Sequence, residues 1–347
     1  MKLGIGAVSF GPKVQLNMDL LLRAEELGFD SAWTAEAWGN DAVTTASWAL
    51  AQTSKIKVGT AIMQMPARQP AMAAMTAMSL DHLSGGRFIL GLGPSGPQVA
   101  EGWYGVPYGK PLTRTREYIN IIRQVWAREA PVRFEGEYYT IPASGPGSTG
   151  LGKPLKSIVH GNPDIPIYTA SISPNGLRCS GEVADGVFPM MLDPETVDHA
   201  YLPFIEEGFS KAEGEKSLAN FDICPFVTCI MSDDIEGARA PIKHNMALYI
   251  GGMGAREKNF YNNYAKALGF EDAAVEIQDH FLSGRRDEAM AAVPAELIDA
   301  CHLVGPADRI RERLARWKTA GEAGQVHNML IGTQQPEALE LIASEML

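Results

Sequence analysis

Short runs of β-forming residues alternate with amphipathic helical stretches from the start of this 347-residue chain to its end. The first unit pairs a predicted strand at 3–8 with a predicted helix at 14–27, in which Leu20 and Ala24 share one face. Gly28 stands where a helix commonly ends in a left-handed residue. This alternation is typical of α/β folds, in which helices cover a mostly parallel sheet.

The same unit recurs along the chain. We predict further strands at 31–36, 56–63, 87–93, 165–170, 186–190, 221–231 and 326–331, and helices at 42–52, 70–83, 114–128, 176–184, 195–213 and 306–320. Eight such strands predict a (β/α)8 TIM barrel in a single domain, 1–347. We interpret two irregular segments as insertions, a loop at about 130–163 with a hairpin at 134–141, and a helical segment at about 240–300.

A doubly wound dinucleotide-binding sheet is the main alternative fold. Residues 91–96 read Gly-Leu-Gly-Pro-Ser-Gly and match its glycine-rich fingerprint after a predicted strand. However, Pro94 and Pro97 disfavour the helix that must open at these glycines, and the match falls in the fourth unit rather than the first. We therefore favour the barrel, in which these glycines lie at the face that carries active sites.

Composition excludes several classes of function. The net charge is −11 and no three Lys or Arg residues are consecutive, so nucleic acid is not an expected partner. The longest uncharged stretch, 138–152, is interrupted by prolines and glycines, and no secretory signal precedes the first strand, so we expect a cytoplasmic protein without a membrane span. The four cysteines and seven histidines show no ligand spacing, which predicts no disulfide framework and no metal.

Several segments spread over nearly the whole chain carry a family resemblance. They are Arg68-x-Pro70-Ala71, Ser-Gly-Gly-Arg-Phe at 84–88, Gly-Leu-Gly at 91–93, Gly-Glu-Val-Ala-Asp-Gly-Val at 181–187, and Gly305-Pro306. Together they resemble the luciferase-like flavin and deazaflavin oxidoreductases, and most closely the branch that uses coenzyme F420, such as methylenetetrahydromethanopterin reductase. The resemblance implies a TIM barrel, usually a homodimer, that holds its cofactor at the C-terminal ends of the strands and acts on a small-molecule substrate.

The resemblance also implies where the ring of the cofactor is held. Related enzymes often carry an acid followed by His after the second strand, and here Glu36 is followed by Ala37. A buried carboxylate there can contact the cofactor and hold or relay a proton, although it can also simply bind backbone groups at a strand end. The third strand of these enzymes contains a cis peptide bond, which the alignment places at Ala61–Ile62, next to Met63. From the sequence alone, an ordinary buried strand fits this segment equally well.

A second group of residues is expected to hold the phosphate of the cofactor. Ser171, Ser173, Asn175 and Gly176 follow the fifth strand and open a helix, where backbone N–H groups bind phosphate. A plain strand-to-helix turn capped by Ser173 is the alternative. The resemblance places Gly93 and Ser95 across the barrel mouth from this loop, as further cofactor contacts.

The remaining candidates have weaker support. Trp38, Trp103 and Tyr104 follow strand ends and can wall a substrate pocket or simply pack. Met72, Met75 and Met78 recur at helical spacing, which predicts core positions. The cations Arg256, Lys258, Arg285 and Arg286 lie in the helical insertion, where they can meet an anionic cofactor tail or form a solvated face.

The resemblance predicts an oxidoreductase that moves a hydride between C5 of coenzyme F420 and an organic substrate. Two other functions stay open from the sequence. One is a monooxygenase that uses reduced FMN and oxygen on the same fold. The other is a barrel that binds a cofactor or small molecule without turnover, which the absence of His after Glu36 permits.

Overall fold

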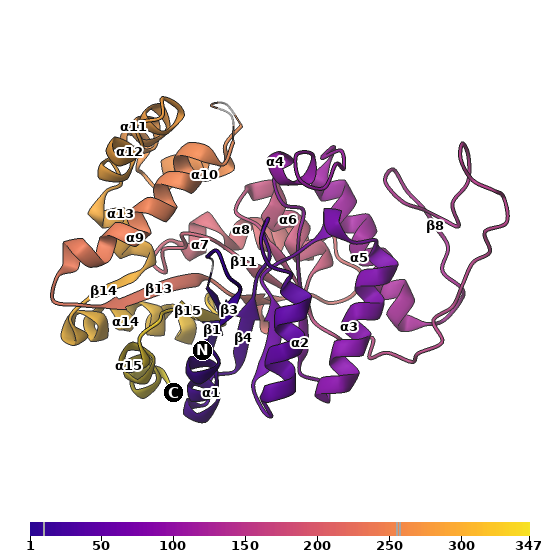
Figure 1. Ribbon diagram of the computed structural model, residues 1–347, viewed down its shortest axis with the longest axis horizontal. Coiled ribbons are helices and arrows are strands. Elements are labelled where there is room, and N and C mark those ends of the chain that lie inside the picture. Colours follow the sequence, from indigo (N-terminus) through magenta and orange to yellow (C-terminus); the bar gives the residue numbers. More distant parts are fainter. Residues whose placement is uncertain (10, 255, 257) are drawn as a thin grey trace.

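The computed structural model describes residues 1–9, 11–254, 256 and 258–347, and a barrel of parallel strands forms its centre (Figure 1). The barrel strands are β1 (Lys2–Gly6), β4 (Ser31–Thr34), β5 (Lys57–Thr60), β7 (Phe88–Gly93), β10 (Ile167–Ala170), β11 (Gly186–Phe188), β12 (Asp222–Ile223), β13 (Phe226–Met231) and β15 (Asn328–Gly332). They pair in the order β12-β11-β10-β7-β5-β4-β1-β15-β13. The predicted TIM barrel is confirmed.

The barrel closes where β12 continues into β13. Val187 of β11 pairs with Ile223, and its carbonyl accepts a hydrogen bond of 2.9 Å from the N–H of Cys224. The carbonyl of Pro225 then accepts from the N–H of Leu330 in β15, also at 2.9 Å. Proline has no N–H to donate to a neighbouring strand, and the chain changes partner at this point. The single strand predicted at 221–231 is therefore two strands that join the ends of the sheet.

Helices surround the barrel. They are α1 (Met18–Leu27), α2 (Ala42–Gln52), α3 (Pro70–Ser84), α5 (Pro111–Ala127), α6 (Pro174–Val183), α7 (Val197–Ala200), α8 (Leu202–Phe209), α14 (Ala307–Glu322) and α15 (Pro336–Met346). Gly28 ends α1 with a φ of 91°, as its position predicts. The helix expected at 195–213 is instead two, separated at Tyr201, because Pro203 cannot donate a helical hydrogen bond.

The two predicted insertions leave the barrel on opposite sides (Figure 1). The helical one contains α9 (Ile235–Ala247), the π-helical turn η3 (Leu248–Gly252), α10 (Phe260–Ala267), α11 (Glu271–Leu282), α12 (Arg286–Ala291) and α13 (Ala295–Cys301). The loop at 130–163 contains the predicted hairpin as β8 (Phe134–Glu135) and β9 (Thr140–Ile141). Within the described ranges, no helix is long and apolar enough to cross a membrane.

Several short elements were not predicted because each is below the length at which periodicity can be recognised. They are β2 (Val8–Ser9), β3 (Gln15–Leu16), β6 (Met63–Gln64), η1 (Met65–Ala67), α4 (Pro97–Ala100), η2 (Leu218–Asn220) and β14 (Leu303–Gly305). Of these, β6 continues the third barrel strand after a break at 61–62, and β14 adds a strand beside the end of β13.

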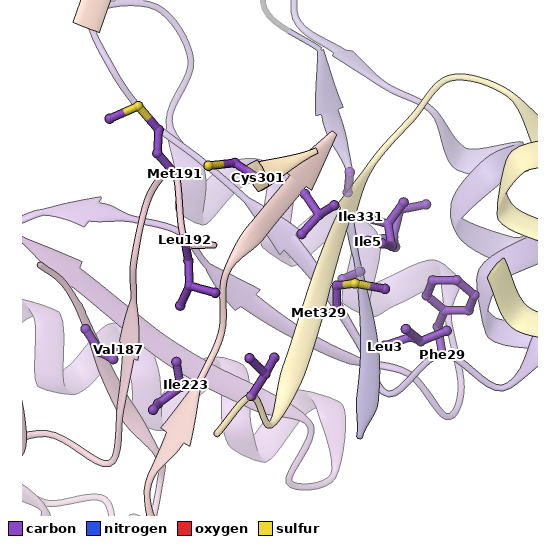
Figure 2. Close-up of a cluster of buried hydrophobic side chains, with 14 of the residues drawn as sticks. Leu3, Ile5, Phe29, Val187, Met191, Leu192, Ile223, Cys301, Met329 and Ile331 are labelled. Atoms are coloured by element: carbon purple, nitrogen blue, oxygen red, sulfur yellow. The ribbon is translucent and has the colours of Figure 1, made fainter. Parts of the chain in front are cut away.

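Two hydrophobic clusters stabilise the fold. The outer one lies between strands and helices and includes Leu3, Phe29, Ile223 and Met329 (Figure 2). The inner one fills the barrel and consists of Trp33, Ile89, Tyr168, Phe188, Cys224 and Leu330. A Cβ atom at Gly59 would lie 2.3 Å from the ring of Trp33, so glycine is needed there to admit the indole. The barrel is thus a packed core and not a pore.

The methionines of α3 differ from the prediction. Met78 is buried, but Met72 and Met75 are each more than half exposed. The core prediction is therefore right for Met78 and wrong for Met72 and Met75, which lie on the side of α3 that faces away from the barrel. Their exposure leaves an apolar surface on α3 that none of the described residues covers.

His302 connects α13 to β14 in a neutral state. Its Nδ1 accepts a hydrogen bond of 3.1 Å from the backbone N–H of Thr228 in β13. Burial lowers the pKa of His302 from 6.5 to about 4. Because an accepting Nδ1 must be unprotonated, protonation of this ring opposes the native contact.

This arrangement predicts a pH dependence of stability. Between the unfolded pKa and the folded one, the unfolded chain binds the extra proton, so stability falls as the pH falls. Lowering the pH from about 7.5 to about 5 should cost the wild type about 2 kcal/mol more than His302→Asn, which keeps an acceptor near Thr228 but does not titrate. Urea unfolding at the two pH values measures this, and an equal loss in both proteins would contradict it.

Candidate active site

The inward-facing positions of the barrel change from large to small residues at the C-terminal ends of the strands. Alternate residues of a strand face the same side, so Ala170 and Gly332 follow the buried Tyr168 and Leu330 on the inner face. A Cβ atom added at Gly332 would have no neighbouring atom closer than 3.8 Å. We call these positions the small-residue floor, which comprises Gly6, Ala61, Gly93, Ala170 and Gly332. A Cβ atom at Gly6 would likewise meet nothing closer than 3.8 Å, whereas the space beside Gly93 is filled by Ile62.

The third strand crosses this floor at a cis peptide bond. The bond between Ala61 and Ile62 is cis, at the position that the resemblance implied. Both residues are half-buried and pack on the inner cluster. The side chain of Ile62 lies over Gly93, because a Cβ there would be 2.4 Å from Ile62 Cδ1. The Met63 side chain is fully buried in the outer cluster, so it faces away from the mouth.

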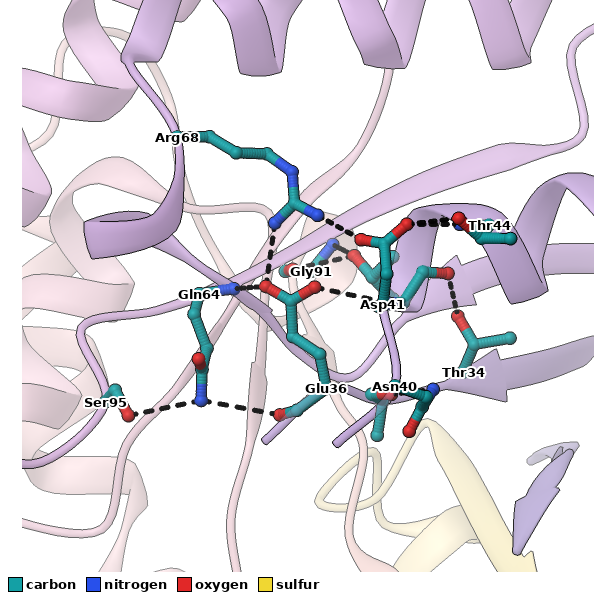
Figure 3. A network of polar contacts seen from close by, with 12 residues as sticks. Thr34, Glu36, Asn40, Asp41, Thr44, Gln64, Arg68, Gly91 and Ser95 are labelled. Atoms are coloured by element: carbon teal, nitrogen blue, oxygen red, sulfur yellow. Dashed lines mark hydrogen bonds and ion pairs between the residues drawn. The ribbon is translucent and has the colours of Figure 1, made fainter. Parts of the chain in front are cut away.

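Glu36 follows β4 and lies within a network of polar contacts (Figure 3). Its Oε1 accepts from the N–H of Gln64 and from Nη1 of Arg68, both at 2.7 Å. Its Oε2 accepts from the N–H of Ala42, the first residue of α2, at 3.1 Å. The side chain is buried, and all three hydrogen bonds are donated to it. Glu36 therefore ties together the ends of β4, β6 and α2.

Arg68 connects Glu36 to Asp41. Its guanidinium contacts both carboxylates, and the hydroxyl of Tyr118 donates to its backbone carbonyl at 3.1 Å. Burial opposes the charge of Arg68, but the hydrogen bond and the charge of Glu36 outweigh it and raise the pKa of the guanidinium. Asp41 also caps α2 by accepting from the N–H of Thr44 at 2.8 Å. The buried charges at the mouth are thus paired.

Gln64 is a functional candidate that sequence reasoning missed. Its Nε2 donates weakly to the carbonyl of Glu36 at 3.5 Å and to Oγ of Ser95 at 3.3 Å, which joins the loops after β4 and β7. Its Oε1 is buried without a hydrogen-bond partner among the described residues, and the residue is only 4% exposed. The sequence signal that could have identified Gln64 is its polar side chain at the end of the otherwise apolar third strand. Such an orphaned acceptor fits a donor that a bound molecule supplies.

The start of α6 has the Ser173 cap that a plain strand-to-helix turn predicts, and its phosphate-binding role stays a prediction. Ser173 caps the helix by accepting from the N–H of Gly176 at 3.1 Å, and Ser171 accepts from Ser180 Oγ at 3.0 Å. A Cβ atom at Gly176 would lie 3.0 Å from Ser173 Oγ and 3.1 Å from Ser171 Oγ. The two hydroxyls and the helix start therefore lie together, whereas the side chain of Asn175 accepts from Arg178.

Three aromatic residues lie in the loops after β4 and β7, which Gln64 connects. Trp38 is 54% exposed and Trp103 is 63% exposed, so neither is packed into the core. Tyr104 is half-buried, and burial together with the charge of Glu36 raises the pKa of its phenol. The indoles of Trp38 and Trp103 are thus exposed, uncharged groups on the loops that follow β4 and β7.

Two of the cations in the helical insertion, Arg256 and Arg286, contact other side chains of the insertion. Arg256 forms an ion pair with Asp279, and the guanidinium of Arg286 lies 3.4 Å from the ring centroid of Phe281. In the described part of the chain, no three His, Cys, Asp or Glu side chains are grouped so that they could share a metal ion.

Comparison with known proteins agrees with this architecture. The model of the luciferase-like monooxygenase family matches residues 4–323. A Mycobacterium tuberculosis protein named as a coenzyme F420-dependent oxidoreductase is 45% identical over 323 residues, which cover 92% of this chain and 93% of that protein. The 5,10-methylenetetrahydromethanopterin reductase of Archaeoglobus fulgidus is 28% identical over 348 residues, covering 100% of this chain and 99% of the other.

A solved structure shows the same fold. The coenzyme F420-dependent tetrahydromethanopterin reductase of Methanopyrus kandleri superposes with a TM-score of 0.76 at 26% identity, covering 99% of this chain and 98% of that one. The chain is an oxidoreductase of the luciferase-like class, and it belongs to the coenzyme F420-dependent branch of the luciferase-like monooxygenase family. This confirms the resemblance found in the sequence.

The orphaned acceptor of Gln64 leads to a prediction about ligand binding. Gln64→Met keeps the shape of the side chain but removes the carboxamide, so a donor on the cofactor loses its acceptor. We expect the dissociation constant for reduced or oxidised F420 to rise roughly tenfold. Fluorescence titration measures it, with Gln69→Met, an exposed glutamine five positions away, as the matched control. Equal affinity in both variants would remove Gln64 from the cofactor site.

The Glu36 network leads to a second prediction. Glu36→Gln places an amide among three donors, so we expect stability to fall by about 1–3 kcal/mol and cofactor affinity to fall with it. Glu25→Gln is the matched control, because Glu25 Oε1 also accepts three backbone hydrogen bonds, from residues 54–56, outside the mouth. Glu25→Gln should lower stability without lowering affinity. A loss of turnover at saturating cofactor, with affinity intact, would instead assign Glu36 the proton relay.

Proposed function

We propose that this protein uses coenzyme F420 to transfer a hydride to or from an uncharged organic substrate at the barrel mouth. The observation that carries the proposal is the small-residue floor with the unpartnered Gln64 Oε1 beside it, in a chain of the F420-dependent branch. When bound, the deazaflavin supplies the carbon that carries the hydride. The residues of the chain supply binding, orientation and the exclusion of water.

The residues at the mouth fit the parts of this cofactor. The floor matches a flat ring, with Ile62 beside the cis peptide bond as its support from below. Gln64 Oε1 has no donor among the described residues, so it can accept a hydrogen bond from the N–H of a pyrimidine ring. The hydroxyls of Ser171 and Ser173 at the start of α6 suit a phosphate, for which helix N-termini are favourable.

The polar network around Glu36 orients the ring of the cofactor. It does not by itself identify the group that supplies a proton. Glu36 is held by three donors, which suits it to fixing β6 and Gln64 in place. Tyr104 is a further ionisable group near Glu36, and the raised pKa keeps its phenol protonated at neutral pH. A protonated phenol beside the mouth can donate a hydrogen bond to a substrate oxygen. The proton relay through Glu36 stays a prediction.

The rim supports an apolar class of substrate. Trp38 and Trp103 expose uncharged surface on the loops after β4 and β7, and the charges of Arg68, Glu36 and Asp41 are paired with one another. A small, mostly apolar organic molecule is the substrate that such a rim suits. The cytoplasmic localisation also stays a prediction.

The decisive experiment compares cofactors. The purified protein should bind F420 at least roughly tenfold more tightly than FMN, a difference of about 1.4 kcal/mol. Reduced F420 labelled with deuterium at C5 should then pass the label to a product carbon in a screen of apolar carbonyl and enone compounds. Tight FMN binding with oxygen consumption would establish the monooxygenase instead. Tight F420 binding without turnover of any compound would favour the non-catalytic alternative.

A further inference from the structure

The helical insertion contains the π-helical turn η3, which two buried asparagines support. Asn259 Nδ2 donates to the carbonyls of Tyr249 and Ile250 at 3.1 and 2.9 Å. Asn262 Nδ2 donates to the carbonyl of Ile250 at 3.2 Å. Each asparagine is only 1% exposed. A π-helical turn interrupts the regular helical hydrogen bonds and is frequent at functional sites. Because buried amides hold these carbonyls, the backbone of Tyr249 has one defined position.

Tyr249 forms an aromatic pair with Tyr261 of α10. Their ring centroids lie 4.8 Å apart, and the two rings meet edge to face at 62°. Asn259 also caps α10, since its Oδ1 accepts from the N–H of Tyr261 at 2.9 Å. The same asparagine therefore holds the backbone of both tyrosines. Edge-to-face pairs are favourable beyond the area that they bury, so the two rings form one aromatic surface.

A third tyrosine approaches this pair from a different strand of the barrel. We define residues 94–110, between β7 and α5, as the mouth loop, which carries Ser95 and Tyr104 as well as Tyr108. Tyr108 lies close enough to Tyr261 that its ionised phenol would raise the pKa of Tyr261. Figure 1 shows α4, within the mouth loop, and α10 at the same end of the barrel. The mouth loop and the helical insertion therefore meet above the C-terminal ends of the strands.

The phenols of these three tyrosines can serve as hydrogen-bond donors to a bound molecule. The hydroxyls of Tyr108, Tyr249 and Tyr261 have no hydrogen-bond partner among the described residues. Burial raises the pKa of each phenol, so all three are protonated at neutral pH. A surface of rings with protonated hydroxyls can pack against a flat group and donate to an oxygen atom on it.

Such a surface distinguishes between apolar molecules of the same size. A saturated ring or chain packs on aliphatic and aromatic side chains alike. A flat, conjugated ring gains additional free energy from stacked or edge-to-face contacts with other rings. An oxygen on that ring also gains a hydrogen bond, which a hydrocarbon cannot accept.

We propose that Tyr108, Tyr249 and Tyr261 form a phenol wall above the small-residue floor, and that this wall selects a flat, unsaturated substrate carrying a carbonyl or hydroxyl oxygen. The inference rests on the proposed function, because it names the substrate class of the same mouth. The floor and the phenol wall then bind different molecules, the ring of the cofactor below and the substrate above.

Calorimetric titration of the protein loaded with oxidised F420 tests the rings of the wall. The wild type should bind benzylideneacetone more tightly than its fully hydrogenated counterpart, cyclohexylbutanone. Tyr249→Leu should reduce this preference at least roughly fivefold. Phe209→Leu is the matched control, because Phe209 at the end of α8 forms an edge-to-face pair with Phe221, with ring centroids 5.2 Å apart, outside the mouth. The control should keep the preference. An unchanged preference in Tyr249→Leu would overturn the proposal.

A variant with Phe at positions 108, 249 and 261 tests the hydroxyls while keeping all three rings. Phenylbutene has the ring and double bond of benzylideneacetone but no oxygen. The preference of the protein for benzylideneacetone over phenylbutene should fall at least roughly fivefold in the variant, because the ketone loses its donors. The preference over cyclohexylbutanone should remain. Circular dichroism verifies folding, and this variant carries the test if Tyr249→Leu does not fold. An oxygen preference equal to that of the wild type would contradict the phenol wall.

Fluorescence titration with F420 keeps this inference distinguishable from the proposed function. Tight F420 binding by the wild type and by Tyr249→Leu, with the preference for benzylideneacetone reduced only in the variant, supports both. Tight F420 binding with equal affinity for benzylideneacetone and cyclohexylbutanone overturns the phenol wall alone. A preference for benzylideneacetone in the cofactor-free protein, without any F420 binding, overturns the proposed function alone.

Discussion

The change from large to small residues inside the barrel is the constraint on which the site depends. Parallel strands must fill their interior, and here Trp33, Tyr168 and Phe188 do so with ring centroids 5.0–5.8 Å apart. At the C-terminal ends of β10, β7 and β15, the small residues Ala170, Gly93 and Gly332 end that filling. Because every parallel strand ends on the same face, these small residues form one continuous floor. A stable core and an open mouth thus follow from the same inward-facing positions.

Above this floor, a buried carboxylate controls the geometry of the rim. An ionised group taken out of water must be compensated, and Glu36 is compensated by two backbone N–H groups and Arg68. One of these N–H groups belongs to Gln64, so the same bonds that satisfy Glu36 fix the residue whose own Oε1 lacks a donor. Among the described residues, the carboxylate of Glu36 has all its donors, whereas the buried Oε1 of Gln64 has none. That asymmetry distinguishes a binding site from a merely structural ion pair.

The sequence predicted the barrel because its signal is periodic and repeated. The helix at 42–52 and the one beginning at Pro70 agree with the structure, since caps and hydrophobic spacing act locally. The break at Pro225 and the strand β14 were missed, because the first depends on which neighbours a strand meets and the second is three residues long. The cis bond at Ala61–Ile62 came from the resemblance alone. Gln64 was missed because an unsatisfied atom is visible only when all its neighbours are placed.

The site depends on α2, an outer helix whose first turn reaches the polar network at the mouth. The first N–H of α2, at Ala42, binds Glu36, and the cap of α2, Asp41, contacts Arg68. The outer side of the same helix carries Trp48 without any charged neighbour on α2. The first N–H of α2 thus holds the carboxylate that in turn fixes the backbone of Gln64. The geometry at the mouth therefore depends on the packing of an outer helix as well as on the barrel strands, because a binding site is held in place by the elements that support it.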